Sequence, residues 1–172
     1  IYLDTDERRR FAQTSHEFLI EQVQSSLGNC QTTGCTAKVP LHFNHPVKEL
    51  VWLSDATAWA RGSSALWTQT AASTGNSTML LRLNGHERFT KRDSTYFTDV
   101  QRYQHHTGAS SVPGAAVSAA PNHLHVYSFA LQPEEHQPSG TCNFSRIDNA
   151  HLEVSVSTGS VNPLDVYAVN YN

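Results

Sequence analysis

Histidines are the residues of this chain whose type and spacing could most readily hold a metal ion. The 172 residues include ten histidines, and a single residue separates His123 from His125. On a β-strand this spacing places both imidazoles on one face, and imidazole is a good ligand for zinc, copper and iron. Two further close pairs are His42 with His45 and His105 with His106. A metal centre built on one of these pairs is the first chemistry to consider.

The sequence after His123 and His125 does not complete a ligand set. In cupins, which are jelly-roll metalloenzymes, such a pair is accompanied by a glutamate a few residues later and by a histidine on a later strand. Residues 126–129 contain no acid, and the next acids, Glu134 and Glu135, lie beyond a proline. We therefore expect no metal and no cofactor, with histidines satisfied by hydrogen bonds. A cupin-like metalloenzyme is kept as an alternative.

Nucleophilic and acid–base catalysis have less support still. The sequence contains no Gly-x-Ser-x-Gly motif and no glycine-rich phosphate loop. Cys142 lies in strand-like sequence, where a buried thiol is usually inert. An odd total of three cysteines favours free thiols, although Cys30 and Cys35 could close a small loop. We therefore expect no catalytic residue and no enzymatic activity.

The segment that follows the last histidine pair has an unusual order of elements. Residues 124–131 have bulky side chains on both faces of a predicted strand, which indicates a strand covered on both sides. The next residues include two prolines, which cannot continue a ladder, and Gly140 permits a turn. So long a polar loop is more easily explained if it contacts something. We predict an interface loop, between sheets or between subunits, made of Pro133, Glu134, Glu135, His136, Gln137 and Pro138.

Short alternating segments dominate the rest of the chain. Asp4 or Thr5 can cap a short helix over residues 6–13, with Glu7 completing a capping box. Apolar alternation predicts strands at 38–43, 47–53, 79–83 and 151–157, whereas residues 18–24 could form a helix or a strand. Polar or small residues predict loops at 25–36, 54–77 and 108–121. Asn84-Gly85 predicts a tight turn. Together these patterns predict an all-β antiparallel sandwich with one short helix.

Tryptophans and one sequon suggest further contacts. Trp52 lies within an apolar strand and is expected in the core, whereas Trp59 and Trp67 lie in a long loop. There they could pack on the sheet or anchor a neighbour. A carbohydrate-binding jelly roll is consistent with these loop aromatics and is a second alternative. Asn76 begins an Asn-x-Thr sequon in a loop and is a possible glycosylation site.

Charge and hydropathy exclude several partners. The formal net charge is −3, and the basic residues are dispersed apart from Arg8, Arg9 and Arg10. Those three follow acidic residues, so we expect a salt-bridged helix face and no direct contact with nucleic acid. No apolar run approaches the roughly 20 residues of a membrane helix, so no transmembrane segment is expected.

Several blocks of sequence closely resemble the major capsid proteins of nucleocytoplasmic large DNA viruses. They lie in the family's order: YLDTDERRRFA at 2–12, FNHPVKEL at 43–50, LNGH at 83–86, YQHHT at 103–107, YSFAL at 127–131, PEEHQPSG at 133–140 and CNFSRI at 142–147. Each block alone would be weak, but their spread over nearly the whole chain is specific. The family's protein has two successive jelly rolls, and these blocks match the second.

This resemblance implies a fold, a function and partners. The fold would be an eight-stranded antiparallel jelly-roll sandwich with one short connector helix. Residues 1–15 would be the end of a preceding jelly roll and a connector, and residues 16–172 the C-terminal jelly roll with a truncated last strand. The chain would form a homotrimeric, pseudo-hexagonal capsomer of an icosahedral shell and would contact other capsomers and minor capsid proteins. It would belong to the virion and assemble in the host cytoplasm.

Overall fold

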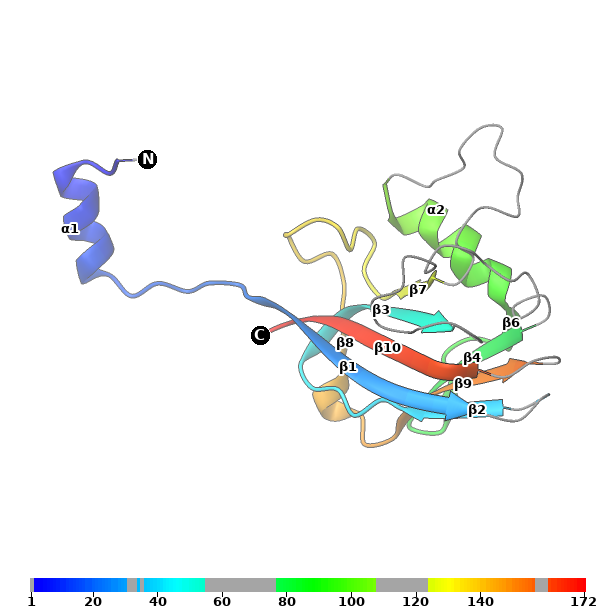
Figure 1. Ribbon diagram of the computed structural model, residues 1–172. Helices are drawn as coiled ribbons and strands as arrows, with labels where there is room; N and C mark the ends of the chain where they lie inside the picture. The colour runs from blue at the N-terminus through cyan, green and yellow to red at the C-terminus, as the bar shows by residue number, and fades with distance from the viewer. Residues whose placement is uncertain (1, 31–33, 35, 55–76, 108–123, 157–160) are drawn as a thin grey trace, which may run out of the picture.

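The computed structural model describes residues 2–30, 34, 36–54, 77–107, 124–156 and 161–172, and these form a two-layered β-sandwich with an N-terminal arm (Figure 1). The strands are β1 (Glu21–Cys30), β2 (Thr36–Pro40), β3 (Pro46–Ser54), β4 (Ser77–Leu83), β5 (His86–Glu87), β6 (Arg92–Asp93), β7 (Leu124–Ser128), β8 (Cys142–Asn143), β9 (Ala150–Val156) and β10 (Val161–Tyr171). The helices are α1 (Thr5–Gln13) and α2 (Gln101–His105).

The strand order is that of a jelly roll. One sheet runs β1-β10-β3-β7, with β8 beside β3, and the other runs β2-β9-β4-β5, with β6 beside β4. Every pairing within the two sheets is antiparallel. The chain alternates between the sheets from β1 to β4 and again from β8 to β10, so each layer is assembled from distant segments. The predicted antiparallel jelly-roll sandwich is therefore confirmed.

Alternating side chains explain why these segments become strands. In β9 the residues alternate strictly between buried and half-exposed, and Leu152 and Val154 enter the core. A strand with one covered face is expected to show this period of two. In β7 the three central residues are all buried, which confirms the prediction of a strand covered on both sides. At the end of β4, Asn84 and Gly85 both have positive φ, as the predicted tight turn requires.

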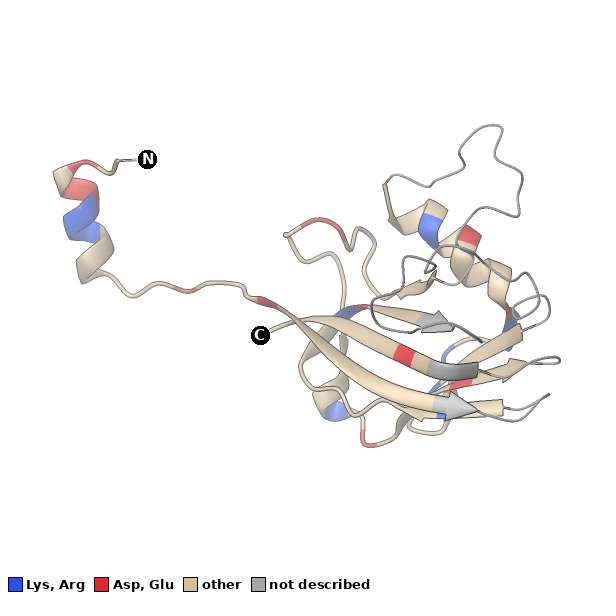
Figure 2. Cartoon of the chain, in the orientation of Figure 1, with Lys and Arg blue, Asp and Glu red and all other residues tan. Residues whose placement is uncertain are grey.

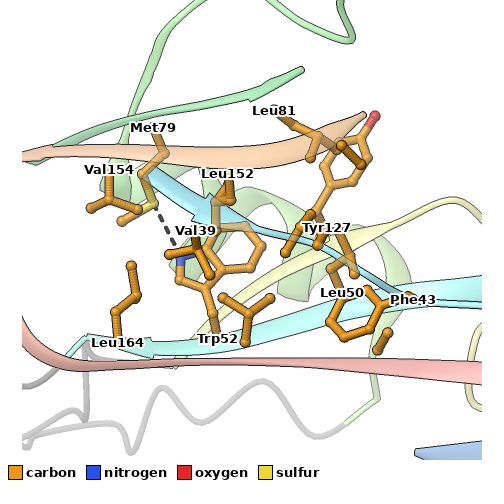
Figure 3. Packing of buried hydrophobic residues seen from close by; sticks show 14 of the residues in the cluster. Val39, Phe43, Leu50, Trp52, Met79, Leu81, Tyr127, Leu152, Val154 and Leu164 are labelled. Carbon is orange, nitrogen blue, oxygen red and sulfur yellow. Dashed lines mark hydrogen bonds between the residues drawn. The ribbon is translucent and has the colours of Figure 1, made fainter. Parts of the chain in front are cut away.

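Trp52 lies at the centre of the core and links the two sheets (Figure 3). It is fully buried, and its Nε1 donates a hydrogen bond to the Sδ atom of Met79 on the opposite sheet at 3.3 Å. Its ring is stacked on that of His125, with centroids 5.7 Å apart and planes 7° from parallel. The expected core position of Trp52 is thus confirmed, and His125 is a core residue.

The first strand extends into a region predicted to be a loop. Residues 25–36 are rich in Ser, Thr and Gly, yet β1 continues to Cys30 and pairs with β10 from Glu21↔Tyr171 to Cys30↔Val161. The long ladder to β10 overrides the low strand propensity of these residues. The loop prediction is therefore wrong for residues 25–30.

A second helical segment, absent from the predicted single-helix fold, lies beside β7 (Figure 1). It is π-helical over Tyr96–Val100 and continues as α2. Phe97 is fully buried, with its ring 5.2 Å from that of Trp52, and the Gln101 Oε1 accepts a hydrogen bond from the Ser128 backbone N–H at 3.2 Å. The segment thus covers one open edge of the sandwich. The sequence did not predict this short segment, which is stabilised by burying Phe97 against residues distant along the chain.

The N-terminal helix α1 confirms the predicted capping. The Asp4 side chain accepts from the helix's first turn, and the Glu7 side chain accepts from the Asp4 backbone N–H. Arg9 pairs with Asp6 at 3.5 Å. No residue of α1 is buried, and an extended segment separates the helix from the sandwich (Figure 1). Neither described helix is long and apolar enough to cross a membrane.

Candidate functional site

The predicted interface loop, residues 133–140, connects β7 to β8 and is called the proline loop below. Pro133 is buried, whereas residues 134–138 are exposed. The neck of the loop is closed by Ser139, whose Oγ accepts from the Gln132 backbone N–H at 3.0 Å and donates to the Gln132 carbonyl at 3.3 Å. Because its tip is open to solvent, this loop does not lie between the two sheets of its own sandwich.

Gly140 allows the end of the proline loop to pass close to β7. Its φ is +151°, and a Cβ atom at this position would lie 2.8 Å from the Phe129 carbonyl oxygen. That contact is shorter than a side chain tolerates, and only glycine adopts the backbone conformation readily. Gly140 is therefore required for a close backbone approach rather than for a turn.

Glu134 attaches the proline loop to the end of α2. Its carboxylate accepts hydrogen bonds from the Thr107 backbone N–H at 3.0 Å, from the Thr107 hydroxyl, and from His106 Nδ1 at 3.1 Å. These donors, the Thr107 hydroxyl above all, lower the pKa of Glu134 below its ordinary value. A second tie runs from His105 Nδ1 to the Leu131 carbonyl at 3.0 Å. The loop is therefore held at its start although its tip is exposed.

His106 lies between two carboxylates from different elements. Its Nε2 is 3.1 Å from Glu49 Oε2 on β3, and its Nδ1 is 3.1 Å from Glu134 Oε1. The carboxylate of Glu49, in ion-pair contact with Nε2, is the main reason that the pKa of His106 is raised; burial opposes this shift, and Glu134 supports it. The two carboxylates lie at opposite nitrogens of one ring and do not converge on a common point. The arrangement suits a charge bridge and not a chelate.

On its other side, the proline loop approaches the start of β1. Lys48 Nζ, nearly buried, donates to Glu21 Oε1 at 2.8 Å, and the same oxygen lies 3.6 Å from His136 Nδ1 in the loop. The hydrogen bond from Lys48 is the main reason that the pKa of Glu21 is lowered. The proline loop thus reaches from the end of α2 to the start of β1.

The other predicted candidates are dispersed. His125 packs in the core, His42 is exposed, and His45 has a φ of 67° in the break before β3. No group of three or more His, Cys, Asp or Glu in the described part of the chain is arranged to hold a metal ion. Burial raises the pKa of the half-buried Cys142 thiol. Four residues of interest, Trp59, Trp67, Asn76 and His123, lie outside the described residues.

Sequence reasoning missed most of the loop's supports. It identified His105 and His106 only as a candidate metal pair, and it assigned no role to Glu49 or Thr107. These residues are far apart in sequence, and only the fold brings them together. The available signal was that YQHHT and PEEHQPSG both belong to the capsid-like blocks, which did not by itself indicate a contact.

Comparison with known proteins decides the family. A model of the large eukaryotic DNA virus major capsid protein matches residues 7–172. The major capsid protein of Pyramimonas orientalis virus is 47% identical over 100% of this chain and 43% of its own length. The chain belongs to the family of large eukaryotic DNA virus major capsid proteins. The relatives from Pyramimonas orientalis virus and Phaeocystis pouchetii virus are both named major capsid proteins, which is the name of a structural protein and not of an enzyme.

Other capsid proteins of the family agree with this assignment, both in sequence and in fold. That of Paramecium bursaria Chlorella virus 1 is 38% identical, covering 98% of this chain and 43% of the relative. The crystal structure of PBCV-1 VP54 superposes with a TM-score of 0.74 at 32% identity, over 99% of this chain and 52% of that one. The same scores hold for the PBCV-1 virus capsid, quasi-atomic model. The chain therefore spans about half the length of the capsid proteins that it matches.

Proposed function

We propose that this chain is the C-terminal jelly roll of a structural capsid protein, which forms trimeric, pseudo-hexagonal capsomers of an icosahedral shell. The supporting observation is the family match over residues 7–172 together with the jelly-roll strand order. Two jelly rolls in each of three chains would give six similar blocks per capsomer. A capsomer of six similar blocks has nearly hexagonal symmetry and fits the hexagonal positions of a closed shell.

The domain assignment is part of this proposal. Residues 1–15 are the end of a preceding jelly roll and a connector, and residues 16–172 are the C-terminal jelly roll. In support, the sandwich begins at Glu21 of β1, and α1 has no buried residue of its own. A helix whose apolar residues are all exposed needs another surface to cover them. The part of the relatives that this chain does not span is large enough to supply a second domain.

The proline loop is proposed as a contact between subunits. Its start is fixed by Glu134, whereas Glu135, Gln137 and Pro138 are exposed at its tip. An interface that reforms identically in every copy benefits from loops that are already ordered, because less entropy is lost on association. Two prolines further reduce the freedom of the free loop. Ordered support below an exposed tip fits this role.

The partners and location follow from the same proposal. The protein contacts itself within capsomers, neighbouring capsomers, and minor capsid proteins; it resides in the virion and is assembled in the host cytoplasm. No direct contact with nucleic acid is proposed, since Lys and Arg are scattered over the described sandwich (Figure 2). A genome-binding surface would gather them on one face.

Replacing the exposed loop tip tests the interface. In the full-length protein, Glu135→Ala, Gln137→Ala and Pro138→Ala together should reduce trimer and particle yield, measured by native mass spectrometry and electron microscopy. A matched control, His86→Ala with Asp148→Ala, changes exposed residues elsewhere on the sandwich and should leave assembly unchanged. Circular dichroism should show the same strand content for both variants. Normal particles from the loop variant would contradict the interface role.

A further inference from the structure

One of the donors that hold the Glu134 carboxylate of the proline loop is an ionisable ring, that of His106. Glu134 of the loop and Glu49 of β3 lie on opposite sides of His106, each 3.1 Å from a ring nitrogen. A neutral imidazole has a single N–H, so it can donate to only one of these carboxylates. Only the imidazolium form has an N–H at both nitrogens and a positive charge beside both carboxylates. The protonation of His106 therefore decides whether the bridge between β3 and the loop is complete.

We propose that His106 is a proton-dependent clamp that sets the position of the proline loop, so that pH controls the surface offered to a neighbouring subunit. The clamp itself is a property of this chain, whereas its effect on assembly rests on the function proposed above. Losing the proton leaves Glu49 or Glu134 without a donor on His106. Glu49 is buried and cannot turn to water easily, so the exposed Glu134 is the partner that loses its bond to His106 and keeps only the two hydrogen bonds from Thr107.

The surroundings of His106 contain no competing cation at contact distance among the described residues. Lys48 on β3 is engaged with Glu21, and His136 in the loop approaches that same carboxylate at 3.6 Å. His105 donates to a backbone carbonyl, and Arg102, one turn earlier on α2, contributes its own carbonyl to the His106 backbone N–H. The charges that face the ring are thus the carboxylates of Glu49 and Glu134. Both favour the imidazolium form.

The sign of the pH dependence follows from the two pKa directions. The pKa of His106 is raised above its ordinary 6.5, so its contribution is complete below 6.5 and is lost as pH rises through the higher folded value. The pKa of Glu134 is lowered below 4.5, so its contribution is complete above 4.5 and is lost as pH falls through the lower folded value. The clamp is closed between these limits and opens as pH rises through the folded pKa of His106.

Hydrogen–deuterium exchange in the full-length protein measures the clamp directly. Exchange at the imidazole carbon reports the pKa of His106, which should lie above 6.5. Amide protection over residues 131–139, corrected for intrinsic exchange, should fall by about threefold to tenfold as pH rises through that pKa, the range expected for losing a partly exposed, charge-assisted hydrogen bond. His106→Gln should show the low protection at every pH and no step. His86→Gln, at the exposed β4–β5 turn, should behave as the unchanged protein.

The outcomes separate the clamp from the assembly role. A pKa at or below 6.5, or an equal pH step in His106→Gln, would overturn the clamp. If His106→Gln misfolds, Glu134→Gln tests the clamp instead. It should abolish the same pH step in amide protection, and its exposed position tolerates the change. A normal pH step in a protein that never forms trimers would support the clamp and refute the proposed function. A protein that forms trimers but shows no pH step in loop protection would refute the clamp and support the proposed function.

Discussion

Replacing Trp52 with Ala should strongly destabilise the sandwich. The side chain is fully buried, donates to Met79 across the two sheets, and packs against the rings of Phe97 and His125. Truncating a buried Trp to Ala costs about 3–5 kcal/mol. The upper part of this range applies here, since two ring contacts and an inter-sheet hydrogen bond are lost together and His125 is left beside a cavity.

This loss is large compared with the total stability of a domain, which is about 5–15 kcal/mol. For a chain of this size, each kcal/mol corresponds to about 2–4 °C in the melting temperature, so Trp52→Ala should lower it by roughly 8–20 °C. Urea unfolding followed by near-ultraviolet circular dichroism measures the free energy, at concentrations low enough to prevent association. Tyr103→Ala is the control, because Tyr103 is 81% exposed and its removal should change stability by less than about 0.5 kcal/mol. A loss below about 1.5 kcal/mol for Trp52→Ala would refute the central position assigned to this residue.

Three other predictions concern the ends of the proline loop and the first strand. Gly140→Ala should destabilise the chain by about 1–3 kcal/mol in urea unfolding, since its Cβ would meet the Phe129 carbonyl oxygen; an unchanged midpoint would contradict this. Glu21→Gln should cost about 1–3 kcal/mol at neutral pH by leaving the nearly buried Lys48 without its anion, and this difference should shrink in acid below pH 4.5; a pH-independent difference would count against the ion pair. Val23→Lys with Leu27→Lys should reduce the self-association of the 172-residue chain on its own, measured by light scattering, because these apolar side chains are 65% and 71% exposed on β1. Unchanged association would mean that another surface causes it.

The elements with strong local signals were predictable from sequence. The capping box formed by Asp4 and Glu7 marked α1, the alternation of β9 marked its buried face, and Asn84-Gly85 marked the turn after β4. In each case the information lies within a few residues of the element. The family resemblance then supplied the order of the strands, which alternation alone does not determine.

The missed features depend on contacts between distant segments. Residues 25–30 have loop-like composition, and only the ladder to β10 makes them a strand. The helical segment at 96–105 is stabilised by burying Phe97 in the core, and the neighbouring residues do not show that Phe97 meets Trp52 there. The bridge from Glu49 through His106 to Glu134 joins three elements that lie 28 or more residues apart along the chain. A single sequence contains little information about such contacts between distant residues.

The most direct test of the account is a structure of the assembled full-length protein by electron cryomicroscopy. We expect trimers in which the proline loop is ordered and Glu135, Gln137 and Pro138 are buried against a neighbouring subunit or jelly roll. Glu134 should keep its contacts with Thr107 and His106 in that structure. Trimers with these three residues in open solvent would contradict the interface role of the loop, and a protein that remains monomeric under assembly conditions would contradict the proposed function as a whole.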